Sequence, residues 1–163
     1  MVALAGHLHE WYAMTTIGAQ TILMAEDDDN DVFFLKRAFK QAQISNPIQR
    51  VRDGEEAIAY LRGEGAYADR QAHPLPHLLL LDLKMPRKNG FEVLAWIRQE
   101  PGIKRLPVAV LTSSREEPDI NRAYDIGANT YLVKPVKFED LLETVKILNS
   151  FWLELAKAPD LSA

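Results

Sequence analysis

The sequence has no cysteine among its 163 residues. This absence excludes disulfides, thiolate zinc sites, iron–sulfur clusters and cysteine nucleophiles, and it is compatible with a cytoplasmic protein. No uninterrupted apolar run reaches the roughly 18 residues that a membrane-spanning helix requires. Lys and Arg form no block and the net charge is −4, which disfavours non-specific binding to nucleic acid.

Hydrophobic residues make up 47% of the chain and charged residues 26%, so there is enough apolar material for one full core. We expect one globular domain over residues 20–157 and a short tail over 158–163. Residues 1–19 lack the basic start of a signal peptide and are expected to form a poorly ordered leader. Either Met1 or Met14 suits as the initiator.

Short apolar runs alternate with amphipathic segments along the domain. The runs predict strands at 21–25, 48–52, 77–83, 106–114 and 130–135. Helical spacing predicts helices at 29–43, 53–62, 91–100, 116–128 and 138–156. This alternation is typical of a doubly wound α/β fold, a five-stranded parallel sheet of order 2-1-3-4-5 between two helical layers, as in flavodoxin-like proteins.

Polar residues stand at the ends of the predicted strands, where an open parallel sheet binds its ligands. Glu26 and Asp27 follow the first strand, Asp82 ends the third, and Thr112 and Lys134 lie at the ends of the fourth and fifth. Crowded carboxylates resist ionisation unless a hard cation such as Mg²⁺ lies among them. A hydroxyl and an ammonium group suit phosphoryl oxygens, so the set predicts phosphoryl transfer to one carboxylate.

Each of these residues also has a structural interpretation. Residues 28–30 are better explained as the cap of the following helix. Thr112 or Lys134 alone would be an ordinary strand-end or surface residue. Their joint placement at the ends of successive strands carries the inference.

Four segments in this order resemble the receiver domain of two-component response regulators, over about residues 20–157. They are AEDD (25–28), LLLLDLKMPRKNG (78–90), VLTSS (110–114) and YLVKP (131–135). The resemblance implies that Asp82 accepts a phosphoryl group from the phosphohistidine of a sensor histidine kinase in a Mg²⁺-dependent reaction.

The resemblance also assigns roles to neighbouring residues. Asp27 is implied as a direct Mg²⁺ ligand, with Glu26 assisting directly or through water and the main-chain carbonyl of Lys84 as a further ligand beside Asp82. Thr112 and Lys134 are implied to contact the phosphoryl oxygens.

Further implied features concern the loop beside the acceptor and the signalling switch. Gly90 is expected where a side chain would crowd the acceptor, and the Lys134–Pro135 bond is expected to be cis. Tyr131 is implied as the aromatic residue that fills the space left when Thr112 moves toward a phosphoryl group.

The long 63–76 loop and the Phe151-Trp152 pair resemble features of single-domain receivers that are paired with phytochrome-type kinases. The resemblance implies a light-sensing histidine kinase as the partner. Only KAPDLSA follows the last predicted helix, so we expect signalling by protein contact. A second apolar stripe (Ile147, Phe151, Leu155) predicts a homodimer through the face formed by 116–126, 130–135 and 138–156. The alternative is that the leader covers this stripe.

Two other classes of protein remain as alternatives. An aspartate-nucleophile phosphatase needs a second acid two residues after the nucleophile, where this chain has Lys84. An interaction module that no longer takes phosphate generally lacks the acceptor, the acids or the lysine, and this chain retains all of them.

Overall fold

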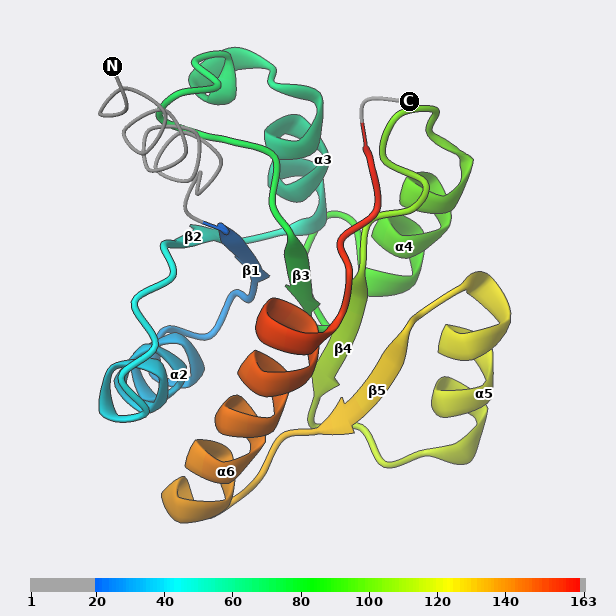
Figure 1. Cartoon of the computed structure of the whole chain (residues 1–163). Coiled ribbons are helices and arrows are strands. Elements are labelled where there is room, and N and C mark those ends of the chain that lie inside the picture. Colours follow the sequence, from blue (N-terminus) through cyan, green and yellow to red (C-terminus); the bar gives the residue numbers. More distant parts are fainter. Residues whose placement is uncertain (1–19, 162–163) are drawn as a thin grey trace, which may run out of the picture.

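The computed structural model describes residues 20–161 and contains a five-stranded parallel sheet with helices on both faces (Figure 1). The strands are β1 (Ile22–Ala25), β2 (Ile48–Val51), β3 (Leu78–Leu81), β4 (Val108–Thr112) and β5 (Thr130–Val133). The helices are α2 (Asp29–Gln41), α3 (Gly54–Arg62), α4 (Gly90–Gln99), α5 (Glu117–Ile126) and α6 (Phe138–Leu148), with a 3-10 helix η1 (Gly65–Tyr67) and a π-helix η2 (Asn149–Leu155). The strand order β2-β1-β3-β4-β5 confirms the predicted fold.

Successive side chains of the central strands point to opposite faces of the sheet and build two cores. Leu23 and Leu79 belong to a core with α3, α4 and α5, whereas Met24 and Leu80 belong to a core with α2 and α6. A strand buried on both faces needs apolar residues at every position. This requirement explains the continuous apolar runs from which the strands were predicted.

The register of the strands brings the predicted site residues to one edge of the sheet. Ala25 of β1 pairs with Leu81 of β3, so the residues that follow them emerge side by side. The main-chain N–H of Asp82 donates to the carbonyl of Ala25 at 3.1 Å, and that of Lys134 donates to the carbonyl of Thr112 at 2.8 Å. The carboxyl ends of β1, β3, β4 and β5 therefore meet where the predicted ligand site lies.

The end of the chain differs from the single long helix predicted over 138–156. The α-helix ends at Leu148, and residues 149–155 continue as the π-helix η2. The apolar repeat in the sequence does not distinguish these two helix types. Val145 and Leu148 are buried against the sheet, whereas Ile147 and Phe151 are exposed, so the two predicted stripes face in different directions.

The described part of the tail packs against the domain. Arg105 donates to the carbonyl of Asp160, and Leu161 packs against the core beside α4. The predicted leader, residues 1–19, lies outside the described residues. Between residues 20 and 161, each helix falls short of the length and apolar character that crossing a bilayer demands.

Candidate functional site

Lys134, directly after β5, lies at the centre of a cluster of carboxylates. Its Nζ is 2.5 Å from Glu26 Oε2, 2.7 Å from Asp31 Oδ2 and 3.0 Å from Asp82 Oδ2. Glu26 and Asp82 are buried at 5% and 6% exposure. The structure thus brings the predicted lysine onto the predicted acceptor, from strands that are distant in the sequence.

Burial and ion pairing act against each other on these groups. Burial is the largest influence on Glu26 and raises its pKa to about 7, although the hydrogen bond from Lys134 lowers it. Burial would lower the pKa of Lys134, but its hydrogen bonds to Asp31 and Glu26 outweigh that effect and raise it. The ammonium group is therefore held in its charged form among the carboxylates.

The pKa of Glu26 predicts how stability depends on pH without divalent metal. The folded protein retains this proton at pH values where the unfolded chain, with the ordinary pKa of 4.5, has lost it. The contribution of Glu26 to the free energy of unfolding should therefore fall as pH rises from 4.5 to about 7. Urea unfolding across this range should show a shallower decline in Glu26→Gln than in the wild type; equal slopes would contradict the assignment.

Three carboxylates are placed to share a cation. Oxygen atoms of Glu26, Asp27 and Asp82 all lie within 4.8 Å of one another, and Asp27 is exposed to solvent. Hard divalent cations such as Mg²⁺ bind carboxylate oxygens and retain several waters. The donor set therefore fits a hard divalent cation that is open to water on one side.

Arg50 of β2 holds the backbone that carries this acidic cluster. Its guanidinium donates to the carbonyls of Glu26 at 3.0 Å and Asp27 at 3.1 Å, and to Asp29 Oδ1 at 2.6 Å. The helix that follows begins as the sequence indicated, because Asp28 Oδ1 accepts from the main-chain N–H of Asp31. Both contacts fix the turn between β1 and α2 before any metal binds.

Thr112, the last residue of β4, is fully buried, and its Oγ1 has no hydrogen-bond partner among residues 20–161. An unpaired buried hydroxyl is costly and rare in native structures. At the edge of the sheet that carries Asp82 and Lys134, the hydroxyl is available to a ligand oxygen. The contact with phosphoryl oxygens that the sequence analysis expects for Thr112 stays a prediction.

Thr112→Val tests whether this hydroxyl is kept for a ligand. Valine has the same shape and removes the unpaired group, so the free energy of unfolding should rise by about 1 kcal/mol. Chemical denaturation measures this change. A loss of stability would show that the hydroxyl already has a partner in the unliganded protein.

The loop after β3 packs closely against the acceptor. The main-chain N–H of Lys84 donates to Asp82 Oδ1 at 3.3 Å. A Cβ atom on Gly90 would lie 2.3 Å from the main-chain oxygen of Asp82 and 2.8 Å from Leu83 Cα, distances that no side chain tolerates. The expected need for glycine here has a steric cause.

In contrast, the expected cis bond at Lys134–Pro135 is wrong. The described residues contain no cis peptide bond, and trans is the intrinsically preferred form.

Tyr131 of β5 is tied to the loop that follows Thr112. Its hydroxyl donates to the carbonyl of Ser114 at 3.0 Å, and the Ser114 hydroxyl donates to Asp119 Oδ2 of α5 at 2.7 Å. The half-buried ring packs against the core shared by α4 and α5. A movement of Thr112 would therefore act on Tyr131 and α5 through Ser114.

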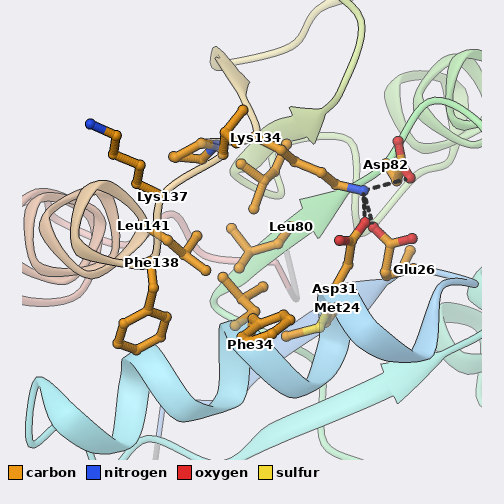
Figure 2. Close-up of a pocket in the computed structure, with 15 residues that line it drawn as sticks. Met24, Glu26, Asp31, Phe34, Leu80, Asp82, Lys134, Lys137, Phe138 and Leu141 are labelled. Atoms are coloured by element: carbon orange, nitrogen blue, oxygen red, sulfur yellow. Dashed lines mark hydrogen bonds and ion pairs between the residues drawn. The ribbon is translucent and has the colours of Figure 1, made fainter.

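An apolar cavity of about 260 Å³ adjoins the charged cluster (Figure 2). It lies between α2 and the start of α6, and its walls include Met24, Phe34, Leu80, Phe138 and Leu141. Figure 2 shows the charged groups of Lys134, Asp31, Glu26 and Asp82 gathered at one end of it. The apolar surroundings reduce the local dielectric and strengthen the ion pairs.

Three residues of this network were not singled out from the sequence. Asp31 lies in the first turn of α2, where acidic residues are common, so its position in the sequence does not mark it as a site residue. Arg50 lies in the strand predicted at 48–52 and Ser114 in the VLTSS segment, and neither pattern assigns the residue a role at the site. Their contacts depend on tertiary packing.

Comparisons with known proteins agree with this geometry. The model of the response regulator receiver domain matches residues 22–146. Response regulator Rcp1 of Synechocystis sp. is 40% identical over 140 residues, which cover 86% of this chain and 93% of Rcp1. A crystal structure of the Mn²⁺-bound form of Rcp1 superposes with a TM-score of 0.77, covering 86% of this chain and 99% of that one.

Two further solved structures are equally similar in sequence. The phosphorylated cyanobacterial phytochrome response regulator RcpA is 40% identical, with a TM-score of 0.81 over 88% of this chain and 100% of its own. Response regulator RPA3017, described in red light signalling of R. palustris, is 40% identical, with a TM-score of 0.82 over 85% and 97%. With the acidic cluster and Lys134 at the ends of the strands, these matches show that the chain belongs to the response regulator receiver domain family.

Proposed function

We propose that this receiver accepts a phosphoryl group from a sensor histidine kinase on Asp82 and signals through its altered surface. The observation that carries the proposal is the convergence of Lys134 and the acidic cluster on one buried carboxylate. A buried, unpaired Thr112 hydroxyl stands at the same sheet edge. Phosphoryl transfer needs positioning and charge stabilisation more than covalent assistance, and this arrangement supplies both.

The reaction assigns a distinct task to each group. An oxygen of Asp82 attacks phosphorus, the P–N bond of the phosphohistidine breaks, and the imidazole leaves with the electron pair of that bond. Lys134 and Thr112 would then hold the phosphoryl oxygens. Glu26, Asp27, Asp82 and the main-chain carbonyl of Lys84 would hold Mg²⁺, which when bound neutralises charge on the phosphoryl group.

The new charge is what would operate the switch. A phosphoryl group adds about −1.5 to −2 charges and three acceptor oxygens beside Thr112. If Thr112 moves toward them, Tyr131 can enter the vacated space and release its hydrogen bond to Ser114. The surface formed by α5 and β5 would then change through a shift between two pre-existing states.

Phosphorylation of the purified chain by acetyl phosphate tests the proposal. Intact mass should increase by one phosphoryl unit with Mg²⁺ and remain unchanged with a chelator. No increase under either condition would identify an interaction module that takes no phosphate. Repeated hydrolysis of phosphate esters over many cycles would instead identify a phosphatase.

The kinase partner is proposed to be of the phytochrome type, because RcpA is a phytochrome response regulator and RPA3017 belongs to red light signalling. Such a partner would act in the cytoplasm. Phe33 of α2 and Val136 before α6 are 62% and 92% exposed, and Phe34 and Val136 line the cavity beside the site. This apolar rim suits the apolar face of a kinase helix.

A charge on the rim should separate docking from chemistry. Phe33→Glu should slow transfer from the kinase and leave phosphorylation by acetyl phosphate unchanged. Phe151→Glu, an equally bulky change on an exposed aromatic of η2, serves as the control and should affect neither reaction. Slowing of both reactions by Phe33→Glu would contradict a docking role.

A homodimer is proposed through the face of α5, β5 and α6 with η2. Tyr124, Ile147, Phe151 and Leu155 are exposed there, at 48%, 66%, 52% and 74%. A groove of about 360 Å³ between β5 and the last helical segment is lined by Leu132, Ile147 and Phe151, among others. Sedimentation should show a dimer that Phe151→Glu weakens and Phe33→Glu does not; a monomer at all concentrations would contradict the proposal.

A further inference from the structure

We propose that Asp31 is a detachable counter-ion that holds Lys134 in the unphosphorylated protein and thereby limits how readily the site takes up a phosphoryl group. The inference rests on the proposed function of Asp82 as acceptor. It assigns a positioning role to a residue of α2 that is neither the acceptor nor a member of the candidate metal cluster.

The ammonium group of Lys134 has no free donor in its present position. It carries three N–H groups, and Glu26, Asp31 and Asp82 each accept from it at 2.5 to 3.0 Å. Figure 2 shows the three carboxylates converging on this one nitrogen. A phosphoryl oxygen can bind the ammonium group only if one of these hydrogen bonds is given up.

Exposure decides which bond is the cheapest to break. The side chains of Glu26 and Asp82 are each 7% exposed, whereas that of Asp31 is 44% exposed. Without metal, a buried carboxylate that loses its cation remains unpaired, but an exposed carboxylate regains hydration from water. With Mg²⁺ held by Glu26 and Asp82, Asp31 is the one of these three partners of Lys134 that lies outside the candidate metal cluster. Asp31 is therefore the partner that Lys134 releases.

The charge of Asp31 acts in the same direction. Its carboxylate is 2.7 Å from the ammonium group that the phosphoryl oxygens would approach, so it repels the incoming anion and competes for its partner. Asp31 is in the first turn of α2, and Lys134 directly follows β5. Breaking their ion pair therefore also removes a link between β5 and the helix that carries the exposed Phe33.

The direct test is the affinity for beryllium trifluoride, a tetrahedral phosphoryl analogue, measured by calorimetry at saturating Mg²⁺. Asp31→Asn should raise this affinity about three- to tenfold, as expected for the loss of one partly exposed ion pair and its repulsion. Glu139→Gln is the matched control, because Glu139 is also a first-turn helix acid, in α6, but is exposed and lies outside the cluster around Lys134. It should change the affinity less than twofold.

A second measurement separates positioning from a general disturbance of the site. Without the analogue, Mg²⁺ affinity of Asp31→Asn should be unchanged or slightly lower, since a nearby negative charge has been removed. A distorted site would lower the affinity for both ligands, so a higher affinity for the analogue without a higher affinity for Mg²⁺ indicates positioning. Asp31→Ser replaces the Asn variant if that variant folds poorly. An analogue affinity equal to or below that of the wild type would overturn the inference, whereas a wild type that binds no analogue would overturn the proposed function instead.

Discussion

Lys134→Ala should lower the free energy of unfolding by about 2–4 kcal/mol in metal-free buffer, because it leaves two buried carboxylates without their cation. Glu26 and Asp82 each keep only 7% of their side chain exposed, so water cannot replace the ammonium group. Added Mg²⁺ should recover much of the loss, since a divalent cation can neutralise the same carboxylates. Urea unfolding with and without Mg²⁺ measures both effects.

The matched control for this variant is Lys146→Ala. Lys146 pairs with Glu143 on the exposed surface of α6 at 3.1 Å, with side chains 49% and 66% exposed. Such pairs contribute at most about 1 kcal/mol, and Mg²⁺ should not affect this variant. Equal losses in the two variants would mean that Lys134 is a surface lysine without a special electrostatic role.

The same Lys134→Ala protein should still bind Mg²⁺ but hold a phosphoryl group poorly.

Gly90→Ala should destabilise the fold and disturb the acceptor at the same time. Helix propensity alone would favour alanine by less than the roughly 0.5–1 kcal/mol seen in helix interiors, because Gly90 is the first residue of α4. The added Cβ would meet the main chain of Asp82 at 2.3 Å, and a main-chain atom cannot move away cheaply. The steric effect should prevail, with a net loss of about 1–3 kcal/mol and slower phosphorylation.

Gly65→Ala distinguishes this steric effect from a general cost of replacing glycine. A Cβ on Gly65 has open space around it, and only its positive φ of 57° opposes the change. The variant should lose about 1–2 kcal/mol at most and retain the wild-type phosphorylation rate. Denaturation and intact mass report the two properties. A stabilised Gly90→Ala with normal phosphorylation would contradict the close packing described for the loop.

The sequence predicts most of the fold because its central strands are buried on both faces. Such strands need long apolar runs, as in 78–81, and their carboxyl ends are then located by the polar residue that follows. Asp82 and Lys134 could be placed at one edge of the sheet for this reason. The alternation of strands and helices indicates a parallel sheet, but it does not determine the observed order 2-1-3-4-5, because other doubly wound sheets have the order 3-2-1-4-5.

The remaining parts of the site depend on tertiary packing that periodicity does not encode. Asp31 resembles any acidic residue in the first turn of a helix, and only its ion pair with Lys134 makes it part of the site. Ser114 acts through a carbonyl and a hydroxyl that no residue pattern reveals. The end of the α-helix at Leu148 likewise cannot be predicted from the sequence pattern, since the apolar repeat continues through η2.

The most direct test of the central claim is to identify the residue that carries the phosphoryl group. After reaction with acetyl phosphate and Mg²⁺, peptide mass mapping of the wild type should locate one phosphoryl group on Asp82. Asp82→Asn should gain none, although it retains Lys134 and the neighbouring acids. A phosphoryl group on another residue, or an equal gain by Asp82→Asn, would contradict the account.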